Sequence, residues 1–284
     1  MREFRRPVLT GLAAAALLGG PVVEAQTSAR EDWDTSRVVD PTALPVPFGP
    51  GEEATYQLKL GVFSVGDGRL AVAGVDTVQG HPAYRLEMDM RGGLGPLKVN
   101  DHFQSWLDTR TLASRRFVRD IHEVNYKSRR EWAIFPEEKR WERVDVENEG
   151  KTLSTLPLDE LAFVYYIRTL PLVVGETYNL TRYFKEDGNP VVVKVLRKER
   201  KEVPGGTFNT IVVQPVIRTS GLFSEGGNAE VYFTDDVHRH VVYLRSEIPV
   251  VGSMTLHLKD IRHGTPLNPK DGRTGAGASS VGSR

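Results

Sequence analysis

The sequence predicts an all-β, mainly antiparallel fold, in which a strongly curved sheet forms an open β-barrel-like wrap around one short buried helix. Apolar and polar residues alternate in residues 56–62, 84–90 and 254–258, and this period of two is typical of strands with one buried face. Turn sequences such as Gly66-Asp67-Gly68 and Pro204-Gly205-Gly206 separate the strand-like runs, as they do in antiparallel hairpins. A two-sheet sandwich with the helix at one end is the alternative architecture.

The other strands are expected in shorter apolar runs that alternate less regularly. These runs are residues 70–75, 103–107, 116–124, 130–135, 141–146, 191–196, 207–218, 229–233 and 241–247. One segment has a different pattern: Asp159 is a suitable helix N-cap, residues 160–170 are apolar almost all round, and Pro171 ends the run. Because a helix without a polar face is expected to be buried, we expect the sheet to curve around it.

Residues 1–25 have the pattern of a secretory signal peptide. Arg2, Arg5 and Arg6 precede an apolar stretch over residues 8–20, and Val23-Glu24-Ala25 places small residues before a cleavable bond. The apolar stretch is shorter than the ~20 residues that a membrane-spanning helix needs. We therefore expect cleavage after Ala25, no transmembrane span after cleavage, and a periplasmic or secreted protein.

Three further segments are expected after the signal peptide. Residues 26–47 contain Pro41, Pro45 and Pro47, and they are expected to form an extended, Pro-rich lead-in. Residues 48–264 are expected to form a single β domain. Residues 265–284 are rich in Gly and Ser, and they are expected to be a disordered tail because they contain too little apolar surface to offset the entropy of ordering.

Composition excludes several classes of protein. The 284 residues include 37 Lys and Arg, 37 Asp and Glu, and no Cys. The absence of Cys excludes a disulfide scaffold, a Cys-based zinc site, an iron–sulfur cluster and a Cys nucleophile. Nucleic-acid-binding proteins usually carry a basic excess, so we expect no nucleic-acid partner, and we expect no cofactor.

Histidine, the usual general base and metal ligand, is clustered at one place. His238 and His240 follow Asp235-Asp236, and two His at i and i+2 on a strand point to one face, where they could hold a metal ion with a carboxylate. Because an Asp-rich turn followed by surface His is common between strands, we expect no metal and regard His238 and His240 as candidate ligands only. His263 occurs in polar sequence and is expected to be solvated.

The basic region, residues 110–143, contains ten basic and six acidic residues with Phe117, Trp132 and Trp141 among them. Such a region could recognise an anionic lipid headgroup, a polysaccharide or a partner protein. The alternative, which we favour, is a solvated outer face whose aromatic side chains belong to the core.

Several short motifs follow one another in a recognisable order: Phe48-Gly49-Pro50-Gly51-Glu52, Asn100-Asp101-His102-Phe103-Gln104-Ser105, Tyr165-Tyr166-Ile167-Arg168, Gly205-Gly206-Thr207-Phe208 and Phe233-Thr234-Asp235-Asp236. In this order they resemble the DUF3108 family, exported bacterial proteins of unknown function, over residue 48 to about residue 261. The resemblance implies no catalytic residue. It implies that Asp101, Arg168 and Asp235 occupy patterned polar positions, either as structural ion pairs or as part of a ligand site. His238-Arg239-His240 departs from the family pattern, which tends toward Arg-x-Pro at this place.

Three functional hypotheses follow. The leading one is a non-enzymatic periplasmic or envelope module that shelters an apolar ligand, such as a lipid, or acts in envelope assembly with a protein partner. The second is a metal-dependent hydrolase that uses His238, His240 and Asp235. The third is a structural interaction protein that uses the basic region.

Overall fold

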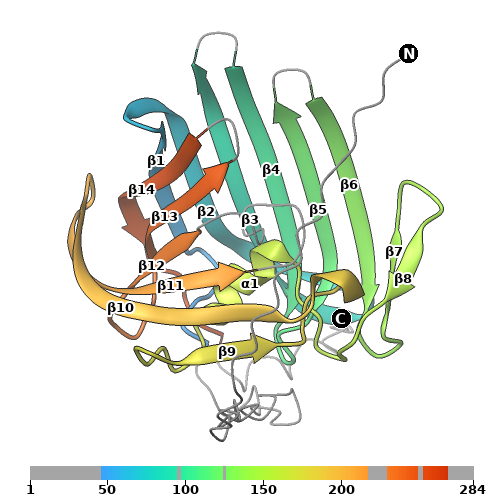
Figure 1. Cartoon of the computed structure of the whole chain (residues 1–284). Helices are drawn as coiled ribbons and strands as arrows, with labels where there is room; N and C mark the ends of the chain where they lie inside the picture. Colours follow the sequence, from blue (N-terminus) through green and yellow to red (C-terminus); the bar gives the residue numbers. More distant parts are fainter. Residues whose placement is uncertain (1–45, 95–96, 124–125, 217–228, 249–251, 268–284) are drawn as a thin grey trace, which may run out of the picture. The chain divides into compact units, whose positions relative to one another are not determined.

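One antiparallel sheet of fourteen strands dominates the part of the chain that the computed structural model describes, which is residues 46–94, 97–123, 126–216, 229–248 and 252–267 (Figure 1). The helix α1 (Glu160–Ile167) follows β8, and the 3₁₀ helix η1 (Glu186–Gly188) follows β9. The strands are β1 (Glu53–Leu60), β2 (Phe63–Val78), β3 (His81–Leu94), β4 (Leu97–Asp108), β5 (Ser114–Glu123), β6 (Tyr126–Phe135), β7 (Arg140–Arg143), β8 (Glu149–Lys151), β9 (Thr177–Leu180), β10 (Val191–Val203), β11 (Gly206–Val216), β12 (Glu230–Thr234), β13 (Val241–Ile248) and β14 (Gly252–Arg262).

Consecutive strands form hairpins throughout the sheet, with β8 and β9 as the exception. The order is β8-β7-β6-β5-β4-β3-β2-β1-β14-β13-β12-β11-β10-β9, so the first strand pairs with the last, from Glu53↔Arg262 to Leu60↔Met254. Because β8 and β9 stand at opposite ends of this order, the sheet is not closed into a barrel. The predicted fold class, a curved antiparallel sheet around one helix, is confirmed, and the two-sheet sandwich is excluded.

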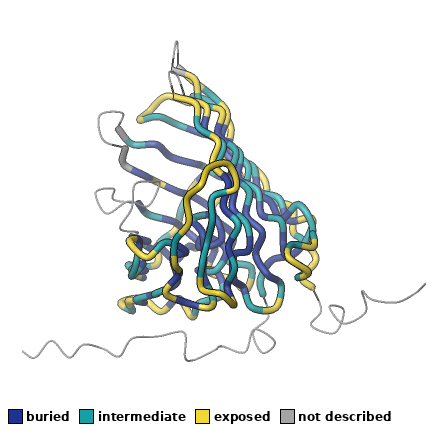
Figure 2. The backbone as a smooth tube through the Cα atoms, turned by 90° about the vertical axis from the view of Figure 1, so that its right-hand side faces the viewer, coloured by how far each residue is buried: buried dark blue, intermediate teal, exposed yellow. Residues whose placement is uncertain are grey.

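The two ends of the sheet are distinguished by the strands that finish there. We call the end where β1, β3, β5 and β13 finish the upper end, as oriented in Figure 1, and the opposite end the lower end. Buried residues follow the strands, whereas exposed residues gather toward the turns (Figure 2). The predicted alternation is clear in β1, where part-buried and buried residues alternate from Glu53 to Leu58.

The predicted turn at Gly66-Asp67-Gly68 is wrong, because these residues lie inside β2, where the glycines allow close strand packing. Two short strands were not predicted, and the strands predicted over 56–62 and 141–146 are too long; β1 ends at Leu60. β8 and β9 contain three and four residues, too few to show an alternating pattern. The run predicted over 141–146 ends at Arg143. The Arg143 backbone N–H donates to the carbonyl oxygen of Asn148, 2.7 Å away, so the chain turns back to β8 at this point.

Glycines allow neighbouring strands to approach closely near the upper end. Gly66 on β2 pairs with Gly92 on β3, and a Cβ atom at Gly66 would collide with the carbonyl oxygen of Arg91. A Cβ atom at Gly68 would lie 2.9 Å from Cδ2 of Leu256 on β14. Because β1 lies between β2 and β14, the approach of Leu256 to Gly68 shows that the sheet curves inward here.

The buried helix α1 begins at its predicted cap. Asp159 Oδ1 accepts hydrogen bonds from the backbone N–H groups of Leu161 and Ala162, at 3.0 and 2.9 Å, and Oδ2 accepts one from the Ser105 hydroxyl on β4 at 2.6 Å. Six of the eight helical residues are buried, as predicted. The helix ends at Ile167 instead of residue 170, because the next N–H groups bond three residues back and tighten the chain into turns.

Aromatic side chains fill the space between the helix and the sheet. Phe48, which precedes β1, packs edge-on against Tyr84 on β3 and Tyr165 on α1, with ring centroids 5.4 and 5.1 Å apart. Phe117 and Trp132, on β5 and β6, stack with centroids 5.4 Å apart. Phe48 thus links a ring on the helix to a ring on the sheet.

The expected terminal segments lie mostly beyond the described residues. These include the signal peptide (1–25), all but the end of the lead-in (26–47) and all but the start of the tail (265–284). The Thr265 backbone N–H donates to the carbonyl oxygen of Pro50, 3.0 Å away. No helix within the described ranges is both long enough and apolar enough to cross a membrane.

The close approach at Gly66 predicts a large loss of stability on Gly66→Ala. A methyl group there must displace the Arg91 backbone, so we expect the free energy of unfolding to fall by about 1–3 kcal/mol. Gly74→Ala, on the same strand, is the matched control because a Cβ atom there meets nothing within 4 Å. Urea unfolding of both variants measures the difference. If Gly66→Ala were as stable as Gly74→Ala, β2 and β3 would be able to move apart at Gly66 without loss of unfolding free energy.

The helix cap predicts a pH-dependent stability difference. Burial raises the pKa of Asp159 from 3.8 to about 6, although hydrogen bonds from the Ala162 N–H and the Ser105 hydroxyl act in the opposite direction. The folded protein therefore binds this proton more tightly than the unfolded chain does. The resulting stabilisation is complete below about pH 4 and is lost as the pH rises through about 6.

We expect wild type to lose up to about 3 kcal/mol of unfolding free energy relative to Asp159→Asn between pH 4 and 7, at about 1.4 kcal/mol per pKa unit. Chemical denaturation of both proteins across this range measures the difference. Glu147→Gln, at an exposed carboxylate, is the control and should show no such trend. A difference between wild type and Asp159→Asn that stays constant with pH would contradict the prediction.

Candidate functional site

Arg168 connects three parts of the chain at the lower end of the sheet. It follows α1, is 5% exposed, and donates to Glu52 through Nη1–Oε1 at 2.6 Å and Nη2–Oε2 at 2.9 Å. Nε and Nη2 also donate to the His238 carbonyl oxygen, at 3.2 and 2.8 Å. The guanidinium lies 5.2 Å from the ring centroid of Phe48 and 5.3 Å from that of Tyr165. Arg168 thereby joins the helix to the chain before β1 and to the β12–β13 turn.

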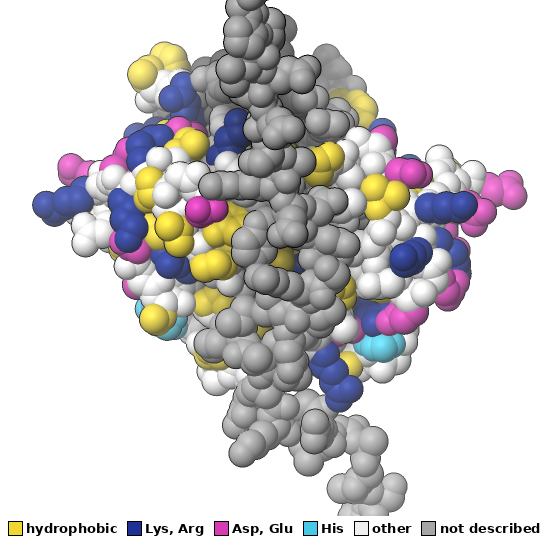
Figure 3. Space-filling view, turned by 60° about the horizontal axis from the view of Figure 1, so that its bottom comes forward, with side chains coloured by type: hydrophobic (Ala, Val, Ile, Leu, Met, Phe, Trp, Pro, Cys, Tyr) yellow, Lys and Arg dark blue, Asp and Glu magenta, His cyan; other side chains and the backbone are white. Residues whose placement is uncertain are grey.

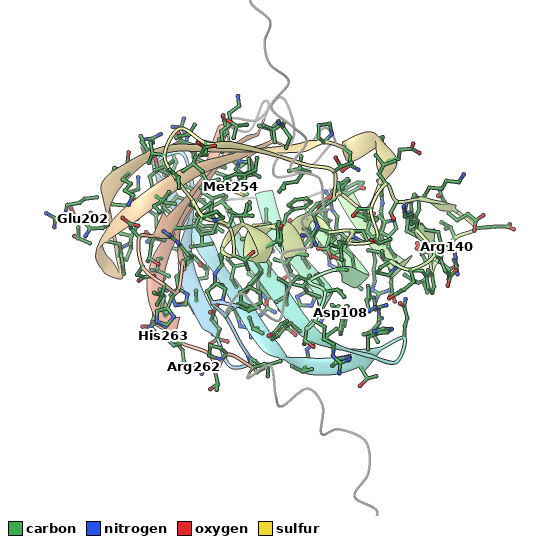
Figure 4. The ribbon with its side chains drawn as sticks, turned by 90° about the horizontal axis from the view of Figure 1, so that it is seen from below. Asp108, Arg140, Glu202, Met254, Arg262 and His263 are labelled. Atoms are coloured by element: carbon green, nitrogen blue, oxygen red, sulfur yellow. The ribbon has the colours of Figure 1, made fainter. Side chains whose placement is uncertain are left out.

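The pairing of the first strand with the last brings Glu52 and His263 to the same end of the sheet. Glu53 lies opposite Arg262, so the residue before Glu53 and the residue after Arg262 both leave the sheet at the lower end. Viewed from below, His263 and Arg262 lie at the rim of the curved sheet (Figure 4).

Three histidines meet beside Glu52, and we call His238, His240 and His263 the three-histidine group. One ligand atom of each lies within 4.8 Å of the others. His240 Nε2 and His263 Nδ1 are 3.0 Å apart, and His240 Nδ1 lies 3.8 Å from Glu52 Oε2. His240 is buried, His238 is part-buried and His263 is exposed.

The local backbone, and not a strand, turns His238 and His240 toward each other. Both residues precede β13, whereas the i and i+2 spacing was expected to act within a strand. Arg239 between them has a φ of 51°, which is in the left-handed region. The rings of His238 and His240 stack with centroids 5.5 Å apart and planes 19° apart.

Burial keeps His240 neutral. It lowers the pKa of His240 from 6.5 to about 3, with further lowering from the positive charge of Arg168 and from the neighbouring imidazoles. Asp236 acts in the opposite direction. At neutral pH His240 therefore has one ring nitrogen with a free lone pair and one N–H.

Two carboxylates define the turn before the histidines. Asp236 Oδ1 accepts from the Thr234 hydroxyl and from the backbone N–H groups of His238 and Arg239, at 2.7, 2.9 and 3.0 Å. These hydrogen bonds lower the pKa of Asp236 even though burial acts to raise it. Asp235 lies 2.7 Å from Lys198 Nζ and 3.3 Å from Arg239 Nη1, and the bond from Lys198 lowers the pKa of its carboxyl.

A hollow of about 490 Å³ opens beside this turn. Its lining residues are Pro47, Arg168, Thr169, Asp235, Asp236, Val237 and Arg239. Five of these seven residues are polar or charged, so the hollow offers both ionic and apolar contacts. On the wider lower face, basic and acidic side chains are interspersed on both flanks (Figure 3).

The structure brings together four of the five predicted site residues. Arg168 contacts His238, His238 stacks on His240, and Asp235 shares the hollow with Arg168. Asp101 lies elsewhere, on β4 toward the upper end, where its Oδ1 accepts from the His122 backbone N–H at 3.0 Å.

The sequence interpretation missed Glu52 and His263. Glu52 was quoted only as part of a turn motif, and His263 was expected to be solvated; it is exposed but contacts His240. Both residues could have been found only from the pairing of β1 with β14. Glu53 lies opposite Arg262 in that register, so residues 52 and 263 are brought close together.

In the basic region, many cations lie against acidic or aromatic side chains. Arg115 lies 2.8 Å from Asp108 and 2.6 Å from Glu137, and Arg116 lies 2.6 Å from Glu131. Phe117 and Trp132 are fully or almost fully buried. The predicted placement of the aromatic residues in the core is confirmed for Phe117 and Trp132, whereas Arg115, expected on a solvated face, is 1% exposed and buried with Asp108.

The buried Arg168–Glu52 pair predicts that Arg168→Met strongly destabilises the protein. The side chains of Arg168 and Glu52 are 3% and 6% exposed, so the variant leaves a buried carboxylate uncompensated. We expect the unfolding free energy to fall by about 3–5 kcal/mol.

Arg262→Met is the control because Arg262 is 67% exposed and lies 3.7 Å from Glu53; it should cost less than about 1 kcal/mol. Denaturant titration measures both variants. If Arg168→Met lost no more stability than Arg262→Met, the pair would have no role in holding the lower end together.

Comparison with solved structures finds similar chains at low sequence identity. A β-barrel-like protein of the domain of unknown function DUF1849 from Brucella abortus aligns at 10% identity over 78% of this chain and 100% of its own, with a TM-score of 0.46. The hypothetical protein CT021 from Chlamydia trachomatis aligns at 10% identity over 75% and 87%, with a TM-score of 0.35. Similarity at this level does not transfer a function, and no curated protein matches the chain.

A match to a protein-family model shows which family the chain belongs to. The model described as a protein of unknown function, DUF3108, matches residues 55–259. This range includes Asp101, Arg168 and the two histidines of the β12–β13 turn, whereas Glu52 and His263 lie outside it. The chain therefore belongs to the DUF3108 family.

Proposed function

We propose that the protein is an extracytoplasmic, non-enzymatic binding module that holds an apolar ligand, such as a lipid acyl chain, on the concave face of its open sheet. Residues 1–25, with the pattern of a signal peptide cleaved after Ala25, support the location. The observation that carries the binding function is that the apolar residues on the concave face of the long strands extend well beyond the one short helix packed on it.

The helix is much shorter than the strands it packs against. Eight residues of α1 span ~12 Å, whereas the 14 residues of β3 span ~46 Å. The Asp159 cap meets the sheet at Ser105 on β4, and β3–β6 continue beyond α1 toward the upper end (Figure 1). A single helix therefore covers only part of the concave face.

The concave face toward the upper end is largely apolar and includes adaptable side chains, with the buried carboxylate of Asp101 opposite Met90. Met88 and Met90 on β3 and Met254 on β14 are 5%, 3% and 9% exposed and belong to the main apolar core, and Met254 lies within the curve of the strands (Figure 4). Phe103 and Ile121 lie on the same face. Because Met has an unbranched, flexible side chain, it can repack around ligands of different shape.

The space below this region, against the helix, is already filled. A small void of about 10 Å³ lies between α1 and the sheet, lined by Phe163, Val164, Ile167, Val191, Pro215, Val231 and Phe233. Such a void holds at most about one water molecule. A ligand would therefore enter toward the upper end, where methionines can move, and the unclosed sheet would let the two edges separate without breaking strand pairing.

The proposal is tested with the full chain expressed with its N-terminal segment and recovered from the periplasm. The purified chain should begin at Gln26. Lipid extracted from it should contain acyl chains by mass spectrometry, and the delipidated protein should bind a fluorescent fatty acid. Met254→Trp fills the concave face and should weaken probe binding at least tenfold.

Val75→Trp is the matched control because Val75 is 40% exposed; it should bind the probe like wild type. Thermal unfolding checks that both variants fold. Recovery without lipid together with no probe binding, or equal binding by Met254→Trp and wild type, would reject the apolar-ligand function. A chain retained in the cytoplasm would reject the location.

A further inference from the structure

We infer that His238, His240 and His263 form a site for one late first-row divalent transition-metal ion, such as Zn²⁺. The site lies at the lower end of the sheet, away from the apolar face described above, and does not depend on the proposed function. It differs from the metal site considered from the sequence, because His263 and not Asp235 completes the group.

The spacing of the three imidazoles is close to that of a metal site. With Zn–N bonds of ~2.0–2.1 Å, the nitrogen ligands of a tetrahedral ion are about 3.3–3.4 Å apart. His240 Nε2 and His263 Nδ1 are 3.0 Å apart, and all three ligand atoms lie within 4.8 Å of one another. The part-buried His238 and exposed His263 need only small side-chain rotations to close this gap around an ion.

Glu52 supplies the carboxylate that commonly supports a metal-binding histidine. His240 Nδ1 lies 3.8 Å from Glu52 Oε2, and a shift of less than about 1 Å would bring an N–H on Nδ1 into hydrogen-bonding distance. In that tautomer the Nε2 lone pair is directed toward His263. A carboxylate behind a histidine fixes its tautomer and increases its basicity as a ligand. Two hydrogen bonds from Arg168, at 2.6 and 2.9 Å, hold this carboxylate in place.

The surrounding charges allow a dication. The neighbouring cations Arg168, Arg239 and Arg262 each lie against a carboxylate, Glu52, Asp235 and Glu53 respectively. Asp236 lies at the start of the same turn and accepts from the His238 N–H at 2.9 Å, so its negative charge lies beside the group. Because His263 is exposed, solvent can reach the ion and supply a fourth ligand.

The three imidazoles also indicate which ions the site would select. Neutral imidazole suits Zn²⁺, Cu²⁺ and Ni²⁺, whereas Mg²⁺ and Ca²⁺ prefer oxygen ligands. Asp235, the carboxylate first considered as a ligand, lies against Lys198 and Arg239. The group therefore presents three nitrogen ligands and favours the late transition metals.

Isothermal titration of the tag-free, chelator-treated full chain with ZnCl₂ tests the inference. Wild type should bind one equivalent of Zn²⁺ and show no heat with MgCl₂, and Zn²⁺ should raise its melting temperature because the ion binds the folded state. His263→Gln and His238→Gln should each weaken Zn²⁺ binding at least tenfold. His122→Gln is the matched control, since His122 is an exposed histidine paired with Asp120 on β5.

His263→Gln changes an exposed side chain, so circular dichroism should show an unchanged fold. Two outcomes would overturn the inference: no Zn²⁺ binding by wild type, or Zn²⁺ affinity and thermal stabilisation that are the same in His263→Gln as in wild type. Both readouts concern the metal alone, so they stand apart from the lipid measurements that test the proposed function.

Discussion

The buried ion pair between Arg168 and Glu52 is the interaction on which the lower end of the molecule depends. Removing two charges from water is costly unless each is matched, and here both carboxylate oxygens and three guanidinium nitrogens are used within the protein. The pair joins the chain before β1, the end of α1 and the β12–β13 turn, which are far apart in sequence. Each of these three segments is therefore positioned by the other two.

The same pair determines where the three-histidine group can form. Arg168 holds the His238 carbonyl oxygen, and Glu52 lies behind His240. His263 joins the group because β14 pairs with β1, which places the residue after β14 beside the residue before β1. The group is thus a consequence of closing the first strand on the last, and its polar chemistry lies at the opposite end of the sheet from the methionine-containing concave face. One curved sheet thereby presents an apolar surface and a polar site that do not compete for the same residues.

Much of the fold was predictable because its signals are local. Strict alternation marks β1, β3 and β14, and Pro204-Gly205 marks the turn between β10 and β11. Gly66-Asp67-Gly68 did not mark a turn, because its glycines allow close packing inside the sheet. Asp159 followed by an apolar run marked the helix and its burial. The short strands β8 and β9 were missed because three or four residues cannot show a period. The helix ends earlier than predicted because the N–H groups of residues 168–170 bond three residues back.

Antiparallel strands around one buried helix follow from the amino-acid order, because side-chain alternation and turn chemistry act between residues close in the chain. The same order indicated Arg168, His238, His240 and Asp235 as polar positions of interest. The folded arrangement was needed to show that His263 and Glu52 join them, that Asp235 contacts Lys198, and that Asp101 lies apart. The reason is physical: the register of β1 with β14 joins residues some two hundred positions apart, and no local pattern encodes which strand closes on which.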